Sequence, residues 1–191
     1  MLDKETRERI ITLIHKEVVP AMGCTEPMAV ALCTAKATEL LYSKPEKICV
    51  KLSANVLKNA MGVGIPGTGM IGLPIAIALG TLIGKSEYQL EVLKDLTPES
   101  LEEGKRYIGG KHIDISLKEN ISEKLYIEIT CTSGDKMSKA IIASSHTNFV
   151  YLEQNGNVLL DKRSGATAEA EDNDIMLNMQ MVHEFATTAP L

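Results

Sequence analysis

Cys24 and Glu26 lie two residues apart in the segment Gly23–Pro27, directly before a stretch with helical spacing. The N-terminus of a helix carries free N–H groups and a partial positive charge, which favour a thiolate, the form of cysteine that acts as nucleophile or metal ligand. Glu26 could then act as a base or only pair with the helix dipole. The structural alternative is a helix cap with a small buried cysteine. The pattern therefore predicts a reactive Cys24 and leaves its chemical role open.

A glycine-rich loop, Gly62–Gly69, precedes an apolar stretch with helical character. Glycines allow backbone N–H groups to converge on an anion, such as a carboxylate or a phosphate, without obstruction by side chains. Lys58 and Asn59, immediately upstream, could add a positive charge and an amide. The alternative is a tight irregular connection that binds nothing. We predict a small anion-binding site at this loop.

His146 lies in a polar run, residues 144–148, between two predicted strands. Histidine can transfer protons near neutral pH, although a lone histidine is more often a structural hydrogen-bond partner. Cys33, Cys49 and Cys131 have no ligand-like neighbours, and the chain contains no Cys-x-x-Cys pair. The sequence therefore predicts no self-contained zinc or iron–sulfur site.

Two segments imitate nucleotide-binding motifs. The spacing of Gly62, Gly64 and Gly67 matches a dinucleotide-binding turn, but the segment follows a predicted short helix rather than a strand. Gly80–Ser86 resembles a phosphate-binding P-loop, but it is one residue short and continues a helix. We therefore expect neither a dinucleotide site nor an ATP site.

Apolar periodicity predicts the elements that would hold these residues. Helices are expected over 3–19, about 25–41, 55–60, 73–83, 97–109 and 175–185. Strands are expected over 47–53, 111–117, 125–132, 137–144 and 148–153, with a hairpin turn at Asn155-Gly156. Thr25 is the expected N-cap of the second helix, residues 61–69 are expected to be neither helix nor strand, and the polar segment 164–174 is expected to be a loop.

These elements predict an α+β fold, with a helical first half that contains the glycine-rich loop and a mostly antiparallel second half. Two lobes are one option for this arrangement. The expected portions are residues 1–110, mainly helical, residues 111–163, an antiparallel sheet, and residues 164–191, a loop and a C-terminal helix truncated from a longer protein.

The composition is that of an ordinary globular chain: 191 residues, of which 45% are hydrophobic and 24% are charged. The net charge of −5 opposes nucleic-acid binding that is driven mainly by charge. The longest apolar stretch, residues 70–83, is too short for a bilayer and is interrupted by Gly72, Pro74 and Gly80. The charged N-terminus has no signal-peptide pattern behind it. We predict a cytoplasmic protein without nucleic-acid or membrane partners.

Five motifs occur in the same order as in the bacterial and archaeal L-cysteine desulfidase family, which the chain resembles along nearly its whole length. These motifs are Val19–Pro27, Lys58–Gly69, Gly72–Ala76, Glu91–Asp95 and His146–Asn148. That family is related to the alpha chain of the iron–sulfur L-serine dehydratases.

The resemblance implies an oxygen-sensitive lyase that acts on L-cysteine or L-serine. A [4Fe–4S] cluster with one open iron would act as Lewis acid, a base would remove the Cα proton, and loss of sulfide or water would lead to pyruvate and ammonia. Cys24 matches the family's N-terminal cysteine, as a cluster ligand or an acid/base group, and Glu26 and His146 are the further catalytic candidates. The implied substrate-binding residues are Thr25, Lys58, Asn59, Gly67, Thr68, Gly69 and Asn148.

Family members are much longer than this chain, and their other cluster cysteines lie in a C-terminal part for which Cys33, Cys49 and Cys131 are no match. The expected partners are therefore a small amino-acid substrate and a C-terminal domain or second subunit, with a homo-oligomer as a further option. We expect neither cluster binding nor turnover by this chain alone. The alternatives are a non-catalytic module that binds a small carboxylate and a purely structural domain.

Overall fold

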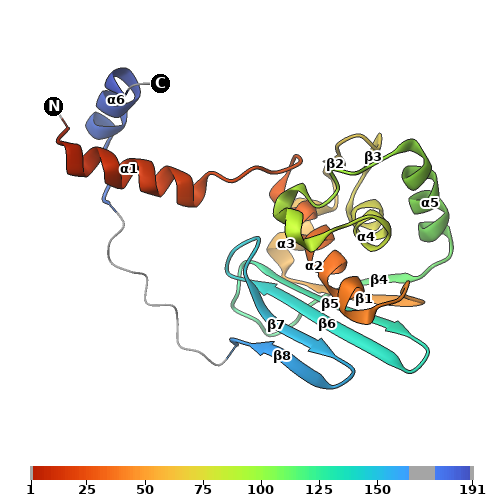
Figure 1. Cartoon of the computed structure of the whole chain (residues 1–191). Helices are drawn as coiled ribbons and strands as arrows, with labels where there is room; N and C mark the ends of the chain where they lie inside the picture. Colours follow the sequence, from red (N-terminus) through yellow and green to blue (C-terminus); the bar gives the residue numbers. More distant parts are fainter. Residues whose placement is uncertain (1, 164–174, 190–191) are drawn as a thin grey trace. The chain divides into compact units, whose positions relative to one another are not determined.

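The computed structural model describes residues 2–163 and 175–189, and its chain divides into two units (Figure 1). Residues 20–164 form one unit, and residues 1–19 together with 165–191 form the other. The predicted boundary at residue 163 lies one residue from the end of the larger unit, whereas the predicted boundary at residue 110 falls inside that unit. The reason is that β1 (Lys47–Leu52), from the helical half, lies inside the sheet between β4 (Ile113–Leu117) and β5 (Tyr126–Ser133).

The sheet of the larger unit has six strands in the order β4-β1-β5-β6-β7-β8. Its remaining members are β6 (Lys136–Ala143), β7 (Phe149–Gln154) and β8 (Asn157–Asp161). Only the β1–β4 pair is parallel, and all other neighbours are antiparallel. Helices dominate the first half and strands the second, which confirms the predicted α+β fold.

Five helical segments accompany this sheet: α2 (Thr25–Leu41), α3 (Ala54–Ala60), α4 (Leu73–Leu82), the 3-10 helix η1 (Ser86–Glu91) and α5 (Pro98–Gly109). The helix α2 packs against β5 and β6, and α4 packs against α2 on one side and α5 on the other (Figure 1). Because α2 lies between the sheet and α4, eleven of its 17 residues are buried and only Glu39 is exposed. This sandwiched position makes α2 the framework on which the candidate site at its N-terminus rests.

The crossing of α2 and α4 depends on small residues. A Cβ added at Gly80 of α4 would lie 2.6 Å from the carbonyl oxygen of Ala31 in α2. The alanines of α2 allow the same close approach from the other side, because a larger side chain would separate the two backbones. The small residues of α2 and α4 therefore allow the two helix backbones to pack in close contact.

The smaller unit contains α1 (Lys4–Glu17) and α6 (Met179–Thr188). Asp3 caps α1 by accepting from the N–H of Thr6 at 2.7 Å. Arg7 joins the two helices, because its Nη2 donates to Thr188 Oγ1 at 2.8 Å. The N–H of Leu2 also donates to the Glu184 carboxylate.

The predicted N-cap of α2, the predicted start of the C-terminal helix and the predicted absence of strand in the glycine-rich segment are wrong. The residue at the N-cap of α2 is Cys24 rather than Thr25, and the C-terminal helix begins at Met179 rather than at 175 because Asn178 caps it there. The glycine-rich segment contains a short ladder in which β2 (Gly64–Ile65) pairs with β3 (Met70–Ile71). The predicted loop 164–174 lies outside the described residues.

The predicted hairpin turn at Asn155-Gly156 is confirmed, with both residues at positive φ, 49° and 81°. Among the helices of the described ranges, none combines the length and the apolar character that crossing a membrane requires.

The close helix crossing predicts the effect of adding one methyl group. An alanine inside a helix is usually more stable than a glycine by about 1 kcal/mol, but at position 80 the new Cβ meets backbone that cannot rotate away. We expect Gly80→Ala to lower the free energy of unfolding by about 1–3 kcal/mol in urea titrations. Gly109→Ala is the matched control, because no atom lies within 4 Å of its added Cβ. Equal or higher stability of Gly80→Ala would contradict this packing.

Candidate functional site

The first turn of α2 carries the reactive pair predicted from the sequence. Cys24 is the N-cap residue, in extended conformation, and its side chain makes no capping hydrogen bond. Gly23 precedes it at a φ of +84°, and a Cβ at this position would lie 2.7 Å from Pro66 Cγ. Glycine is therefore favoured at position 23 for two reasons: its positive φ, and the lack of space for a Cβ beside Pro66 of the loop. This contact brings the glycine-rich loop against the turn that holds Cys24.

Glu26 is the centre of a hydrogen-bonded cluster in this first turn. The Cys24 thiol donates to Glu26 Oε2 at 3.0 Å, and the Thr25 hydroxyl donates to the same oxygen at 3.3 Å. The amide nitrogen of Asn59, from α3, donates to Glu26 Oε1 at 3.2 Å. Both carboxylate oxygens therefore accept hydrogen bonds. The structure brings together Cys24, Thr25, Glu26 and Asn59 of the predicted site.

These contacts shift the pKa values of the two acidic groups in opposite directions. The hydrogen bond from Cys24, the largest cause, and that from Asn59 lower the pKa of Glu26. Burial, followed by the hydrogen bond to Glu26, raises the pKa of the Cys24 thiol. The backbone N–H groups at the helix start act in the opposite direction on Cys24, but they are outweighed. The pKa of Cys24 is therefore shifted away from the thiolate that the helix N-terminus was expected to favour, first by burial and then by the Glu26 carboxylate.

His146 approaches the same cluster from the other half of the chain. Its charge makes a minor contribution to the lowered pKa of Glu26, and among the described residues no hydrogen bond joins its imidazole to the cluster. His146 lies in the turn between β6 and β7 and is half-buried. Asn148 closes this turn, because its side-chain nitrogen donates to the Ala143 carbonyl at 3.0 Å. The substrate-binding role of Asn148 stays a prediction, and its recorded contact is with the turn.

The glycine-rich loop keeps two backbone donors available. The Thr68 hydroxyl donates to the Ile65 carbonyl at 2.7 Å and accepts from the N–H of Met70 at 2.9 Å, so its side chain braces the turn. Gly67 and Gly69 have positive φ values of 77° and 64°. Neither amide N–H has an acceptor among the described residues. Backbone N–H groups without an acceptor are potential donors for an anion.

Lys58 makes no recorded hydrogen bond or ion pair with the described residues of the cluster. It occupies the last turn of α3 and is exposed, whereas its neighbour Asn59 is half-buried against Glu26. The helix α3 therefore directs the amide, and not the ammonium group, at the candidate site.

The other cysteines do not join Cys24. Cys33 and Cys131 are fully buried in the core, where burial raises the pKa of Cys131 to about 12. Cys49 lies on the sheet, with its sulfur 3.9 Å from Asp114 Oδ2. Within the described residues, no group of three or more His, Cys, Asp and Glu side chains could hold a metal ion. A [4Fe–4S] cluster needs several protein ligands, so these residues do not fit it by themselves.

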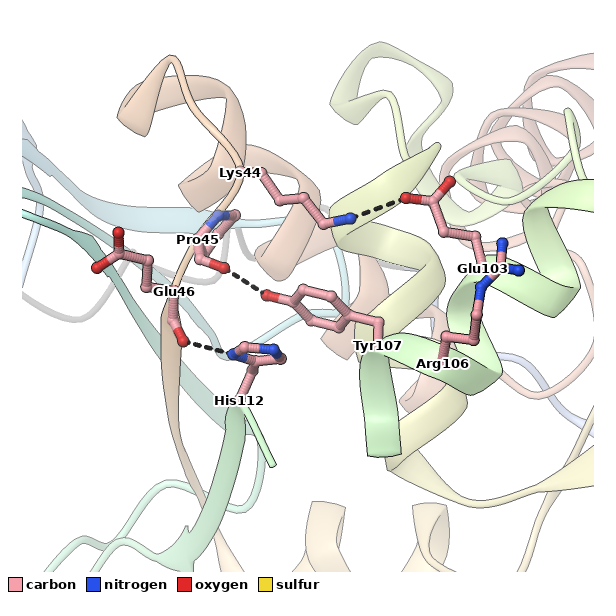
Figure 2. A pocket seen from close by; sticks show the side chains of 7 residues that line it. All are labelled: Lys44, Pro45, Glu46, Glu103, Arg106, Tyr107 and His112. Atoms are coloured by element: carbon pink, nitrogen blue, oxygen red, sulfur yellow. Dashed lines mark hydrogen bonds and ion pairs between the residues drawn. The ribbon is translucent and has the colours of Figure 1, made fainter. Parts of the chain in front are cut away.

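A recess of about 500 Å³ lies in the larger unit and contains none of the residues of the Cys24 cluster (Figure 2). Tyr107 donates to the Pro45 carbonyl at 2.8 Å, and its ring stacks on His112 with centroids 4.8 Å apart. His112 Nδ1 donates to the Glu46 carbonyl at 2.7 Å. Lys44 also pairs with Glu103 at 2.8 Å. The polar groups of this recess are largely occupied by one another, as expected of a brace between β1, α5 and β4.

Sequence reasoning missed two contacts. It assigned Asn59 to the substrate, whereas the structure shows it as a donor to Glu26, 33 residues away. It also did not single out His112, whose imidazole stacks on Tyr107 and donates to the Glu46 carbonyl. No local pattern could have indicated either contact, because each depends on tertiary packing.

The carboxylate of Glu26 predicts how the Cys24 thiol ionises. In Glu26→Gln the negative charge and the acceptor that hold the proton on sulfur are lost, so we expect the pKa of Cys24 to fall. Alkylation rates measured against pH, in a Cys49→Ser background, would show the inflection at lower pH than with Glu26 present. Cys24→Ser identifies the signal from Cys24. An inflection that stays in place or moves to higher pH would contradict the assigned interaction.

Known proteins with related sequences are longer than this chain. The chain is 62% identical over 191 residues to a UPF0597 protein of Bacteroides thetaiotaomicron, which covers 100% of this chain and 44% of the relative. It is 49% identical over 195 residues to a UPF0597 protein of Porphyromonas gingivalis, covering 99% of this chain and 45% of the relative. The UPF0597 protein PBPRB0240 of Photobacterium profundum is 42% identical over 186 residues, with 43% of its length covered.

No model of a known protein family matches the chain, and no solved structure matches it. The names of these relatives state no activity, so the resemblance to L-cysteine desulfidases stays a prediction. The chain spans less than half the length of the curated relatives that it matches.

Proposed function

We propose that this chain forms the proton-transfer and carboxylate-binding part of a lyase that eliminates sulfide or water from L-cysteine or L-serine. A further polypeptide would complete the site. The observation that carries this proposal is the hydrogen bond from the Cys24 thiol to Glu26 Oε2, 3.0 Å long, beside the glycine-rich loop. The ordered motifs shared with the desulfidase family support the choice of substrate.

The opposite pKa shifts supply one acid and one base at neutral pH. The raised pKa of Cys24 keeps the proton on sulfur, and the lowered pKa of Glu26 keeps that carboxylate ionised. Neighbouring groups whose pKa values are pushed apart commonly divide acid and base roles between them. We assign Glu26 as the base and Cys24 as the acid. His146 lies within electrostatic range of Glu26 and is a further proton carrier.

The glycine-rich loop would hold the carboxylate of the amino acid. The free N–H groups of Gly67 and Gly69 are donors for it, and the Gly23–Pro66 contact sets the loop against the acid–base pair. Fixing the carboxylate would position the Cα–H bond relative to Glu26, and such positioning lowers the entropic part of the barrier. Asn59 would orient Glu26 through its amide rather than contact the substrate.

The proposed reaction balances in two stages. Glu26 takes the Cα proton of L-cysteine or L-serine, the Cβ–S or Cβ–O bond breaks, and Cys24 gives its proton to the departing sulfide or hydroxide. The resulting 2-aminoacrylate takes up water and yields pyruvate and ammonia. Glu26 then returns its proton to Cys24 across the hydrogen bond between them. We assign the [4Fe–4S] cluster and its remaining ligands to the completing polypeptide, because the described residues do not fit it alone.

Activity of the completed protein tests these roles. The chain is co-expressed anaerobically with the unmatched part of the Bacteroides thetaiotaomicron relative, supplied with iron and sulfide, and assayed for pyruvate from L-cysteine and L-serine. We expect Cys24→Ala and Glu26→Gln each to reduce kcat by about 10²-fold or more. Cys49→Ser is the control and should keep full activity, since Cys49 lies on the sheet beside Asp114. Full activity of Cys24→Ala would overturn its role.

Calorimetry on the chain separates the lyase from a non-catalytic carboxylate-binding module. The free N–H groups of the loop favour binding of L-serine or pyruvate in either case. Binding by the chain, together with no pyruvate from the completed protein, would favour the binding module. Absence of binding to both would leave Gly62–Gly69 as a packing loop.

A further inference from the structure

One side of α1 is apolar and exposed. Ile11, Ile14 and Val18 recur at intervals of three and four residues and therefore line one side of the helix or its immediate end. Their exposed fractions are 43%, 40% and 70%. Ile10, by contrast, is only 5% exposed. The helix thus buries part of its apolar surface and leaves a second stripe uncovered.

The second helix of the same unit repeats this pattern. None of the residues of α6 is buried. Met181 and Phe185, one turn apart, are half-buried, whereas Met179 and Val182 are 81% and 45% exposed. Just before the helix, Met176 is 90% exposed. The helix α6 therefore also presents an apolar side that the described residues of its own unit leave uncovered.

Exposed apolar residues are concentrated in this unit. Of the fourteen large hydrophobic residues that are exposed in the described ranges, eight lie in α1, α6 or the residues flanking them. Scattered exposed apolar side chains are normal on a protein surface, but a concentration on two amphipathic helices marks an interface. Short helices also gain most of their stability from packing of the apolar side.

A partner polypeptide fits this surface better than a membrane does. Helices that lie on anionic membranes carry an excess of lysine and arginine on their polar side. The sequence of α1 mixes basic residues with Glu5, Glu8 and Glu17, and α6 contains no lysine or arginine. The curated relatives supply a partner, because more than half of their length lies outside the match.

We propose that the uncovered sides of α1 and α6 are the docking surface for the polypeptide that makes up the rest of these longer relatives. The proposal rests on the proposed function only in assuming that a completing polypeptide exists. The smaller unit would then be part of a second lobe of the complete protein. The core of that lobe would form when the apolar stripes of α1 and α6 pack against the partner polypeptide. The unit of residues 20–164 has its own core and does not need it.

Hydrogen exchange tests this surface without relying on activity. The chain alone is compared with a chimera that joins it to the unmatched part of the Bacteroides thetaiotaomicron relative, and with the two parts co-expressed as separate chains. We expect amide exchange in α1 and α6 to slow by about tenfold or more in both completed forms. Exchange in β8, which carries the exposed Val158 and Leu159 outside this unit, should stay unchanged.

Paired variants locate the surface. Ile14→Glu with Val18→Glu, and Met179→Glu with Val182→Glu, should remove the protection and weaken association of the separate chains by about tenfold or more. Val158→Glu with Leu159→Glu adds the same charge at β8 and should change neither. Circular dichroism of each variant chain reports whether its helices remain.

Three results would overturn the proposal: no protection of α1 and α6 in the completed forms, equal weakening by the β8 control, or a dimer of the chain alone that buries the two stripes. Its failure is distinguishable from failure of the proposed function. Protection without pyruvate formation would overturn the lyase and keep the docking surface. Pyruvate formation that is insensitive to the stripe variants, with α1 and α6 unprotected, would overturn the surface and keep the lyase.

Discussion

The candidate site depends on one carboxylate. Glu26 accepts hydrogen bonds from Cys24, Thr25 and Asn59, and these bonds tie the first turn of α2 to α3. The same contacts lower the pKa of Glu26 and, together with burial, raise the pKa of the Cys24 thiol. Without this carboxylate the pKa of Cys24 would be raised by burial alone, and the base of the proposed acid–base pair would be lost.

The fold holds this carboxylate through buried contacts. The helix α2 is packed between the sheet and α4, and it approaches α4 so closely that a Cβ added at Gly80 would lie 2.6 Å from the Ala31 carbonyl oxygen. At its N-terminus the contact of Gly23 with Pro66 sets the glycine-rich loop beside Cys24. Residues from α2, α3 and the loop therefore meet although up to about 40 positions separate them in the sequence. Such support by rigid elements is what a preorganised site requires.

The sequence predicted most of the elements, because apolar alternation and helical spacing are local signals. The strands of the second half, the Asn155-Gly156 turn and the buried helix α4 follow from such signals. Boundaries were less accurate where capping decides them, as at Asn178. The shift of the Cys24 pKa away from the predicted thiolate has a different cause. A rule about helix ends considers backbone charge alone, whereas at Cys24 burial and the side chain of Glu26 dominate.

The most direct test of the account is where the proton resides between Cys24 and Glu26. Infrared difference spectra of the chain against Cys24→Ala report the S–H stretch of this one thiol. The account predicts an S–H band at neutral pH, at a frequency lowered by hydrogen bonding to the carboxylate, that shifts in Glu26→Gln. Absence of the band, which would mean a thiolate at neutral pH, or a band that ignores Glu26→Gln, would contradict the account.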